Sequence, residues 1–233
     1  MHWTLDSDRF IFNGLQTAVA FTTTRRSGIL PGPVAAADLR QVADRFGLQP
    51  AAVVGMEQVH GAFIQTVQES EDAVLAGCDG LVTDQPGVML AVRCADCLPL
   101  IAYHPGRRLL GVAHAGWRGI QAGIPTRLME AMRSVSFSLA DCHVAIGPRI
   151  GPCCYEVGPE FEDWFPEELQ TRKGVRFLDL GKAVVRQLVK AGVPGESVVQ
   201  APWCTACTPD HCHSHRRQGP EAGRMVTAAM IIN

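Results

Sequence analysis

Two histidines and one cysteine occupy positions from which they could bind a single metal ion. His60 ends the run MEQVH, Cys97 closely follows the run VMLAVRC, and His114 lies near the end of the run LLGVAHA. All three stand at expected strand ends, where the chain leaves a sheet and side chains can converge. Two imidazoles and a thiolate suit zinc. Because three protein ligands leave a fourth position open for water or substrate, the pattern is typical of a catalytic zinc centre.

The same residues also have interpretations without a catalytic metal. A histidine at a strand end is often only a satisfied polar group, and a free cysteine is a common buried filler. Cys97 could instead be a nucleophile with His114 as its base, as in a thiol hydrolase. Zinc and a free nucleophile exclude each other because both use the Cys97 thiolate. A metal with a purely structural role is a further alternative.

Two other groups of cysteines have metal-like or redox-like spacing. Cys94 and Cys97 form a C-x-x-C pair, but the pair ends a strand, whereas thioredoxin-type pairs begin a helix. A second group lies in the C-terminal tail and consists of Cys204, Cys207 and Cys212 with His211, His213 and His215. Since C-x-x-C followed by later ligands is a known zinc spacing, a second metal site in the tail stays open.

Composition favours a globular enzyme and argues against several other classes of protein. The 233 residues are 47% hydrophobic and 19% charged, which suits one domain over residues 1–233. A net charge of −2 gives no electrostatic footprint for nucleic acid or an anionic membrane. There is no signal peptide or membrane-spanning run, and the cysteine count of nine is odd. We therefore expect a cytoplasmic protein with reduced thiols, of open oligomeric state.

The elements that must position these residues are mostly strands. Apolar runs of strand length cover residues 53–60, 61–68, 87–94, 109–115, 142–148 and 197–201. The alternating segment 10–24 predicts a hairpin that turns at Asn13-Gly14. Loop or turn signals occupy residues 27–33, 84–87 and 104–107. Apolar spacing predicts helices over 38–46, 118–133 and 181–191, the first and last ended by glycine.

Strands outnumber the helices and do not alternate with them regularly. This order favours an α+β fold with mixed sheets in layers and flanking helices over a doubly wound nucleotide-binding fold. The glycine-rich motifs of dinucleotide-binding and P-loop proteins are not present in the sequence.

Five motifs give the chain a resemblance to a known family. They are GMEQVHG, CDGLVTDQPGVMLAVRCADCLPL, VAHAGWRG, AIGPRIGPCCYEVG and SHRRQGPEAGR. From about residue 53 onward this order resembles the laccase-domain family, also called multicopper polyphenol oxidase-like. Its members are described as purine nucleoside phosphorylases with adenosine deaminase activity, and some bacterial members as peptidoglycan editing factors.

The resemblance implies ligands, a fold and a reaction. His60, Cys97 and His114 match the family's metal ligands in QVHG, ADC and HAGWRG, and the fold would be similar to that of toxins that deamidate glutamine through a Cys/His pair. The implied function is a zinc-dependent phosphorylase acting on adenosine, inosine or methylthioadenosine plus phosphate, with adenosine deaminase activity. An editing hydrolase of peptidoglycan precursors is an alternative. Copper chemistry is less supported, because a laccase needs many paired H-x-H histidines and the only such run is 211–215.

Phosphorolysis requires cations for phosphate and a surface for the base. Arg118, beside the His114 loop and at the start of a predicted helix, is the main candidate for a catalytic and phosphate-binding residue, unless it only braces that loop. Arg216, Arg217 and Arg224 in the tail are weaker substrate-binding candidates, and Arg216 and Arg217 could be surface charges. Trp117 could stack on a purine or pack in the core.

Two aspartates near the candidate ligands have both functional and structural interpretations. Asp96 could orient a ligand or end a strand as a turn residue. Asp79 fits a turn former better than a general base. One segment departs from the family pattern: TTRRSGILPGPVAAADL (residues 23–39) lacks the Gly-Gly-Val-Ser and Leu-Asn-Leu-Gly elements usual there. If those elements help to form the nucleoside pocket, the substrate could differ.

Overall fold

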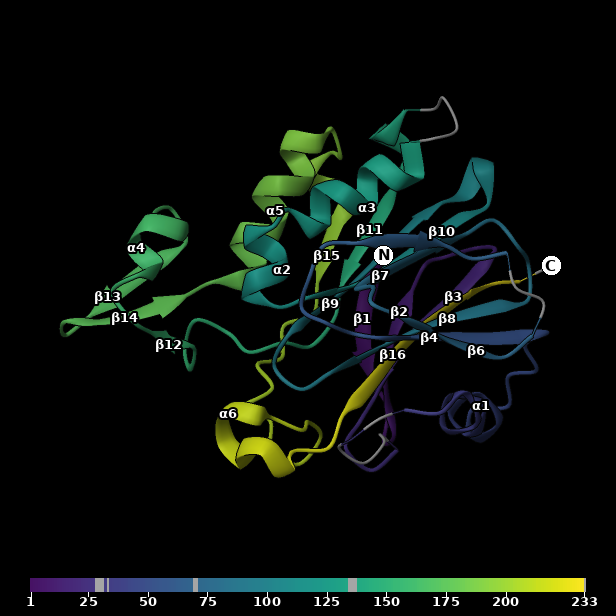
Figure 1. Cartoon of the computed structure of the whole chain (residues 1–233), viewed down its shortest axis with the longest axis horizontal. Coiled ribbons are helices and arrows are strands. Elements are labelled where there is room, and N and C mark those ends of the chain that lie inside the picture. Colours follow the sequence, from purple (N-terminus) through teal and green to yellow (C-terminus); the bar gives the residue numbers. More distant parts are fainter. Residues whose placement is uncertain (28–31, 33, 69–70, 134–137, 233) are drawn as a thin grey trace.

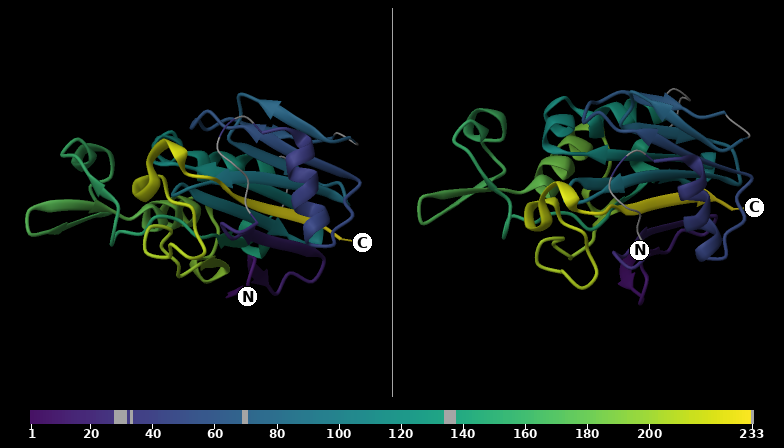
Figure 2. Two further views of the ribbon diagram at one scale, coloured as in Figure 1. Left: turned by 90° about the horizontal axis from the view of Figure 1, so that it is seen from below. Right: turned by 60° about the horizontal axis from the view of Figure 1, so that its bottom comes forward.

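Two stacked β-sheets form the centre of the structure, with helices on both outer faces (Figure 1). The computed structural model describes residues 1–27, 32, 34–68, 71–133 and 138–232, so most of the predicted loop at 27–33 lies outside the described residues. Helix α1 (Ala36–Arg45) covers one sheet. Helices α3 (Ile124–Arg133) and α5 (Leu180–Ala191) cover the other (Figure 2). This layered α+β architecture of mixed sheets and flanking helices confirms the predicted fold class.

The larger sheet brings both ends of the chain together. In spatial order it contains β1 (His2–Leu5), β2 (Arg9–Asn13), β3 (Ala18–Thr23), β16 (Met225–Ile231), β8 (Val88–Cys94), β4 (Ala52–Glu57) and β6 (Ala73–Ala76). Each strand is antiparallel to its neighbour from β1 through β2, β3 and β16 to β8. Strands β8, β4 and β6 run parallel to one another. The pair β2–β3 is the predicted hairpin, but the turn predicted at Asn13-Gly14 is wrong: Asn13 still belongs to β2, and the chain turns over residues 14–17.

The smaller sheet carries the central strands of the candidate site. Its order is β15 (Val198–Gln200), β11 (His143–Ile146), β9 (Leu98–His104), β10 (Leu109–Ala115), β7 (Gly80–Thr83) and β5 (Ile64–Thr66). The middle pairs are antiparallel and the two edge pairs are parallel. A third sheet, β12 (Glu156–Val157), β14 (Val175–Leu178) and β13 (Leu169–Arg172), projects from the body with α4 (Phe161–Trp164) (Figure 1).

Three apolar layers hold these elements together. One lies between the two sheets, the second between the smaller sheet and α3 and α5, and the third between the larger sheet and α1. Strand β8 is buried on both faces, since Leu90 faces the layer between the sheets and Met89 faces α1. Burial on both faces explains why β8 reads as a continuous apolar run in the sequence.

Helix boundaries follow local capping signals. Helix α5 begins after Asp179, whose side chain accepts the N–H of Lys182, and ends at Gly192 with a φ of 104°. The helices predicted over 38–46 and 181–191 are therefore present. The single helix predicted over 118–133 is wrong: α2 (Trp117–Gln121) and α3 are separated because Gly123 adopts a φ of 85°, which a helix cannot contain. A last short helix is α6 (His215–Gln218).

Some predicted strands are shorter than expected and others were missed. The run 61–68 forms only β5, and the strand predicted over 53–60 ends at Glu57. The chain leaves the sheet there because the N–H groups of residues 59–61 donate to a buried carboxylate instead of a neighbouring strand. Strands β1, β6, β7 and β9, the central strand β16 and the small sheet were not predicted. Within the described residues no helix has the length and apolar character needed to cross a membrane.

Candidate metal centre

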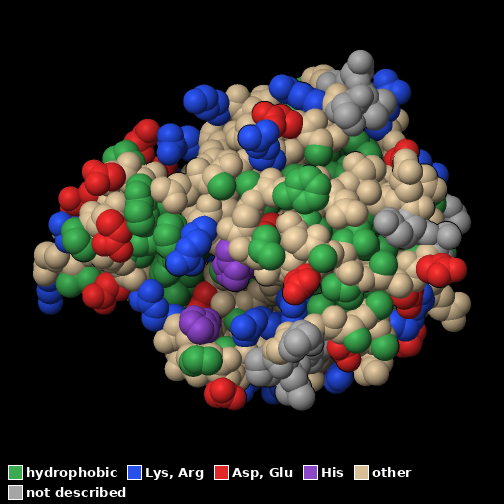
Figure 3. All heavy atoms as spheres, in the orientation of Figure 1, with side chains coloured by type: hydrophobic (Ala, Val, Ile, Leu, Met, Phe, Trp, Pro, Cys, Tyr) green, Lys and Arg blue, Asp and Glu red, His purple; other side chains and the backbone are tan. Residues whose placement is uncertain are grey.

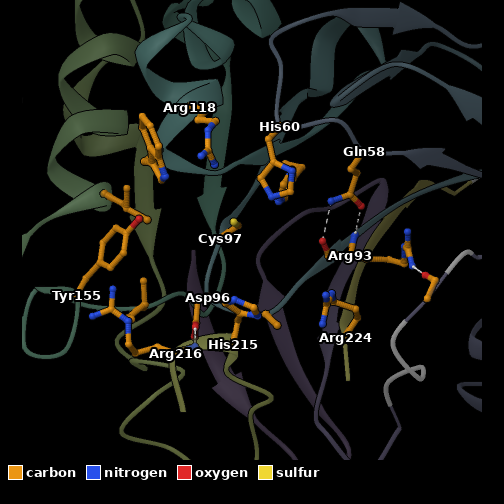
Figure 4. Close-up of a pocket in the computed structure, with 16 residues that line it drawn as sticks. Gln58, His60, Arg93, Asp96, Cys97, Arg118, Tyr155, His215, Arg216 and Arg224 are labelled. Atoms are coloured by element: carbon orange, nitrogen blue, oxygen red, sulfur yellow. Dashed lines mark hydrogen bonds between the residues drawn. The ribbon is translucent and has the colours of Figure 1, made fainter. Parts of the chain in front are cut away.

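The structure brings His60, Cys97 and His114 together, and Figure 4 shows His60 and Cys97 on one side of the cavity they share. One ligand atom from each lies within 4.8 Å of the others, and the two imidazole rings meet nearly edge-on at 83°. His60 lies in the loop after β4, Cys97 in the connection from β8 to β9, and His114 in β10. The centre therefore stands where the chain crosses from the larger sheet to the smaller one.

Asp79 positions two of these three residues. Its fully buried carboxylate accepts a hydrogen bond from Nδ1 of His114 at 2.9 Å. Burial alone would raise the pKa of Asp79, but His114 and the Gly61 N–H keep it below its usual value. Since an ionised carboxylate can only accept, Nδ1 carries the proton and Nε2 of His114 is left for a metal. The sequence-based preference for Asp79 as a mere turn former is wrong.

The same carboxylate stabilises an unusual backbone conformation at His60. His60 has a φ of 60°, a left-handed value that costs a non-glycine residue about 1 kcal/mol. Asp79 offsets this cost by accepting the backbone N–H groups of Val59, His60 and Gly61 at 3.2, 3.0 and 2.6 Å. The strained turn directs the His60 ring toward His114.

Cys97 and His114 stabilise each other's charged forms. Burial opposes ionisation of Cys97, but charge and hydrogen bonds from His114 and His60 lower the pKa of the thiol to about 6. Burial also opposes the charge on His114, yet the Cys97 thiolate and the Asp79 carboxylate raise its pKa to about 9. A thiolate is thus available near neutral pH, which is the form that binds metal.

The backbone leaves room for an ion beside these donors. Gly116 follows β10, and a Cβ there would lie 3.1 Å from Sγ of Cys97 and 3.2 Å from Cδ2 of His60. A side chain at position 116 would therefore crowd two of the three donors. The donor set, the fixed His114 tautomer and the glycine together fit a metal with one open position.

A cavity of about 570 Å³ opens above the three donors. Figure 3 shows a hollow on this face that basic and histidine side chains surround. The basic side chains that line it, besides the donors, are Arg93, Arg118, Arg216, Arg224 and His215. Among the described residues, Asp96 is the one acidic residue of the lining, so the cavity suits an anion.

Asp96 braces one wall of the cavity. It has a φ of 89° between Ala95 and Cys97, and its carboxylate accepts Oγ1–H of Thr205 at 2.5 Å and N–H of Arg216 at 2.7 Å. Its own carbonyl accepts the N–H of Ile150 at 2.9 Å. Asp96 therefore ties the Cys97 connection to two other loops, and it is more than a turn residue.

The predicted substrate-binding residues have different surroundings. Arg118 and Trp117 both line the cavity, with the guanidinium 4.3 Å from the indole centroid. Trp117 also stacks on Trp164 at 5.1 Å, so part of its surface is taken by aromatic packing. Because α2 has only five residues, the predicted support from a long helix dipole is weaker than expected. Arg216 lines the cavity and donates to the carbonyl of Glu156 at 2.9 Å.

Several cavity residues were missed from the sequence. Arg93 lies one residue before the end of the apolar strand β8, and an arginine in such a run was a usable signal. Gln58 pairs with the backbone of Arg93 through two hydrogen bonds of 2.8 Å (Figure 4), and no pattern marks it. Tyr155 and His215 also line the cavity. Arg217, by contrast, donates to the carbonyls of Thr205, Ala206 and Cys212 and is not part of the lining.

Known proteins are similar to this chain in sequence and in fold. The model of the family described as multi-copper polyphenol oxidoreductase laccase matches residues 21–232. Purine nucleoside phosphorylase YlmD of Geobacillus stearothermophilus is 35% identical over 242 residues, covering 90% of this chain and 88% of the relative. Adenosine deaminase RL5, from an unknown prokaryotic organism, is 30% identical over 203 residues, covering 80% and 78%.

A solved structure agrees with this relationship. The crystal structure of YlmD from Geobacillus stearothermophilus matches with a TM-score of 0.89 and 32% identity, over 99% of each chain. The resemblance inferred from the five motifs is confirmed, and it extends to the N-terminal hairpin. This chain belongs to the multi-copper polyphenol oxidoreductase laccase family.

Proposed function

We propose that this chain is a zinc-dependent purine nucleoside phosphorylase, which cleaves adenosine, inosine or methylthioadenosine with phosphate. The observation that carries the proposal is a three-donor centre at the base of a cavity lined by four arginines. Relatives over most of the chain's length are named purine nucleoside phosphorylases, which supports this choice. A cavity of about 570 Å³ is also in the size range of small-molecule sites.

The donor set favours zinc over copper. His60, His114 and Cys97 would hold the ion, and zinc bound there would supply a Lewis acid with one open position. A multicopper centre needs many more imidazoles, and His215 is the one other histidine that lines the cavity among the described residues. Polyphenol oxidation is therefore the less supported alternative.

The arginines would bind and orient the attacking phosphate. Guanidinium groups form paired, charge-assisted hydrogen bonds with phosphate oxygens, and fixed cations do this best inside a cavity. Arg118 is braced by Trp117, while Arg93 is held through Gln58 and the carbonyl of Gly32. Such fixed groups would place phosphate beneath the sugar as the glycosidic bond breaks.

The other wall would contact the base. Ile150, Leu180, Tyr155 and the free part of Trp117 provide apolar surface in the cavity. Burial, followed by the nearby Cys97 thiolate, raises the pKa of Tyr155, so its phenol stays protonated. Tyr155 would therefore donate a hydrogen bond to a purine nitrogen and help the base to depart as an anion.

Adenosine deamination is a second proposed activity of the same centre, supported by the relative named adenosine deaminase. Zinc deaminases relay protons through a carboxylate. Here Asp96 is the acidic residue of the described lining, and both of its oxygens already accept hydrogen bonds. We therefore propose deamination as slower than phosphorolysis.

One observation favours a different chemistry. Asp79, His114 and Cys97 follow one another through hydrogen bonds in the order of a hydrolase triad. A metal-free chain could thus act as a thiol hydrolase, including one that edits peptidoglycan precursors. Bound zinc would occupy the same thiolate, so metal content separates the two functions.

The test is a direct assay of metal-analysed protein. Adenosine with inorganic phosphate is expected to give adenine and ribose 1-phosphate, with less inosine, and a reaction without phosphate should give no ribose 1-phosphate. Cys97→Ser should lose both the metal and the activity, whereas Cys142→Ala, a buried cysteine elsewhere, should retain both. Absence of all three products with zinc bound would overturn the proposal. Full activity of zinc-free protein toward an amide or ester would favour the hydrolase.

The cysteines support a cytoplasmic location for this enzyme, which we also propose. All nine are free thiols, and Cys97 must stay reduced to bind zinc.

A further inference from the structure

Four cysteine side chains from two distant loops meet outside the cavity. Cys153 and Cys154 lie in the segment between β11 and β12, and Cys204 and Cys207 lie between β15 and α6. Their four sulfur atoms all lie within 4.8 Å of one another. Sγ of Cys207 is 3.2 Å from Sγ of Cys154 and 3.6 Å from Sγ of Cys153. None of the four lines the cavity, so the cluster is separate from the centre described above.

The separations suit a metal ion bound by four thiolates. Sulfur atoms at the corners of a tetrahedron with a Zn–S distance of about 2.3 Å stand about 3.8 Å apart. Separations of 3.2 and 3.6 Å are therefore small side-chain rotations away from that geometry. Iron–sulfur clusters place several irons between their cysteines and need a wider group. Four crowded thiolates repel one another, and a divalent cation removes that repulsion.

The backbone brings the two loops together without help from a metal. Arg149 and Cys204 form an isolated parallel bridge, and the N–H of Thr205 donates to the Arg149 carbonyl at 2.9 Å. The N–H of Gly151 donates to Sγ of Cys204 at 3.2 Å, which stabilises a thiolate there. A Cβ on Gly151 would lie 3.3 Å from Sγ of Cys153, so the glycine permits the close approach.

The tail cysteines therefore have partners that their spacing did not indicate. Grouping Cys204 and Cys207 with Cys212 and the tail histidines is wrong for the described structure. Cys212 is fully buried in the layer between the sheets, and His215 lines the cavity. The partners come instead from the Cys153-Cys154 pair about fifty positions earlier in the chain.

We propose that Cys153, Cys154, Cys204 and Cys207 form a second, structural zinc site. Four protein ligands leave no open position, so this site would not perform catalysis. It would join the loop that carries Tyr155 to the loop that leads to α6, which carries Arg216, and both residues line the cavity. Arg216 already donates to the carbonyl of Glu156 across the same junction. Zinc would thus fix one wall of the cavity.

The first experiment counts zinc in protein purified under reducing, anaerobic conditions. Wild type should bind one zinc for each of the two clusters, and Cys97→Ser should lose only the zinc at the His60 centre. A Cys153→Ser/Cys207→Ser variant should lose only the other. Cys212→Ala is the matched control, a tail cysteine outside the cluster, and should keep the wild-type zinc content. Unchanged zinc in the double variant, or loss of zinc in Cys212→Ala, would overturn the proposal.

A second measurement does not depend on the folding of the double variant. In Cys97→Ser loaded with zinc, X-ray absorption should show sulfur-only coordination at about 2.3 Å. Nitrogen in the coordination shell would overturn the four-cysteine assignment. Failure of the four cysteines to bind added zinc would also overturn it, as would a protein mass that reveals a disulfide between them. Because the readouts are zinc content and ligand type, this proposal can fail while the phosphorylase proposal stands, and the reverse.

Discussion

At the residue scale, one carboxylate sets the position of two candidate ligands. Asp79 fixes the proton on Nδ1 of His114 and holds the loop that carries His60 in its left-handed turn. Asp79 hydrogen-bonds to a candidate metal ligand on the side away from the metal position. Mutation of such a residue commonly lowers metal affinity as much as activity.

Asp79→Asn should weaken zinc binding about 10- to 100-fold, because the amide no longer favours the required His114 tautomer and repels one N–H of the His60 loop. Competition with a chromogenic chelator measures the affinity. Asp84→Asn, which changes an aspartate in an exposed turn, is the matched control and should bind zinc like wild type. Equal affinity for the two variants would show that Asp79 does not position the centre.

The Cys97 thiol should be reactive at unusually low pH in metal-free protein. Its pKa of about 6 means that the thiolate dominates above about pH 6, whereas an ordinary thiol ionises near about 8.5. The rate of alkylation of the Cys97 peptide, followed by mass spectrometry against pH, should have its midpoint near 6. His114→Gln should move that midpoint upward, because the imidazolium charge is lost. A midpoint that stays near 6 in this variant would exclude His114 as the cause.

Arg118→Ala should lower kcat/KM for phosphate about 10- to 100-fold, since a charge-assisted hydrogen bond contributes about 1.5–3 kcal/mol. Zinc content should not change, because Arg118 is not a donor of the metal group. Arg127→Ala removes an exposed arginine from α3 and should leave the phosphate dependence unchanged. Steady-state assays with varied phosphate measure kcat/KM for phosphate. Equal values for the two variants would show that Arg118 does not bind phosphate.

At the element scale, the break between α2 and α3 separates a functional turn from a packing helix. Helix α2 begins beside Gly116 and carries Trp117 and Arg118 at the cavity, whereas α3 packs through its apolar face on the smaller sheet. Four-residue apolar spacing runs through both helices, so the pattern alone predicts one helix. Gly123 makes the change of direction possible.

Gly123→Ala therefore distinguishes one continuous helix from two separate helices by whether it raises or lowers the free energy of unfolding. In a continuous helix alanine would stabilise the protein by about 1 kcal/mol, but at a φ of 85° it should destabilise it by about 1–2 kcal/mol. A Cβ at position 123 meets nothing within 4 Å, so packing does not confuse the result. Urea unfolding gives the free energy of unfolding. Gly195→Ala, at a glycine without a positive φ, is the control and should change it little.

At the scale of the whole molecule, the candidate centre joins the two sheets. His60 follows a strand of the larger sheet, His114 belongs to the smaller sheet, and Cys97 lies in the connection between them. An ion bound by all three would add a direct link between the two sheets, which face each other across an apolar layer. Metal binding and global stability are therefore coupled.

Zinc should raise the melting temperature of metal-free protein. Free zinc about 1000-fold above its Kd contributes about 4 kcal/mol of stability. The rise in melting temperature should be smaller in Cys97→Ser. The difference between the two rises gives the contribution of zinc at the His60 centre, separate from that of any other zinc site. Thermal denaturation with and without added zinc tests this expectation. Equal shifts in wild type and Cys97→Ser would contradict it.

The sequence by itself determined the α+β class, the N-terminal hairpin, two of the helices and the family. These follow from local information, because apolar periodicity, capping residues and motif order are properties of short segments. Expected strand ends made it possible for His60, Cys97 and His114 to converge, and the resemblance to the family implied that they bind one metal.

Tertiary structure decided which distant groups meet. Asp79 reaches His114 across 35 positions, and Cys154 reaches Cys207 across 53 positions. Nothing in the local sequence selects such partners, because many pairings of the same side chains have similar local energies. Only the packing of two sheets and the loops between them brings one set of atoms into contact, and that packing turned an apparent turn residue into the support of the metal centre.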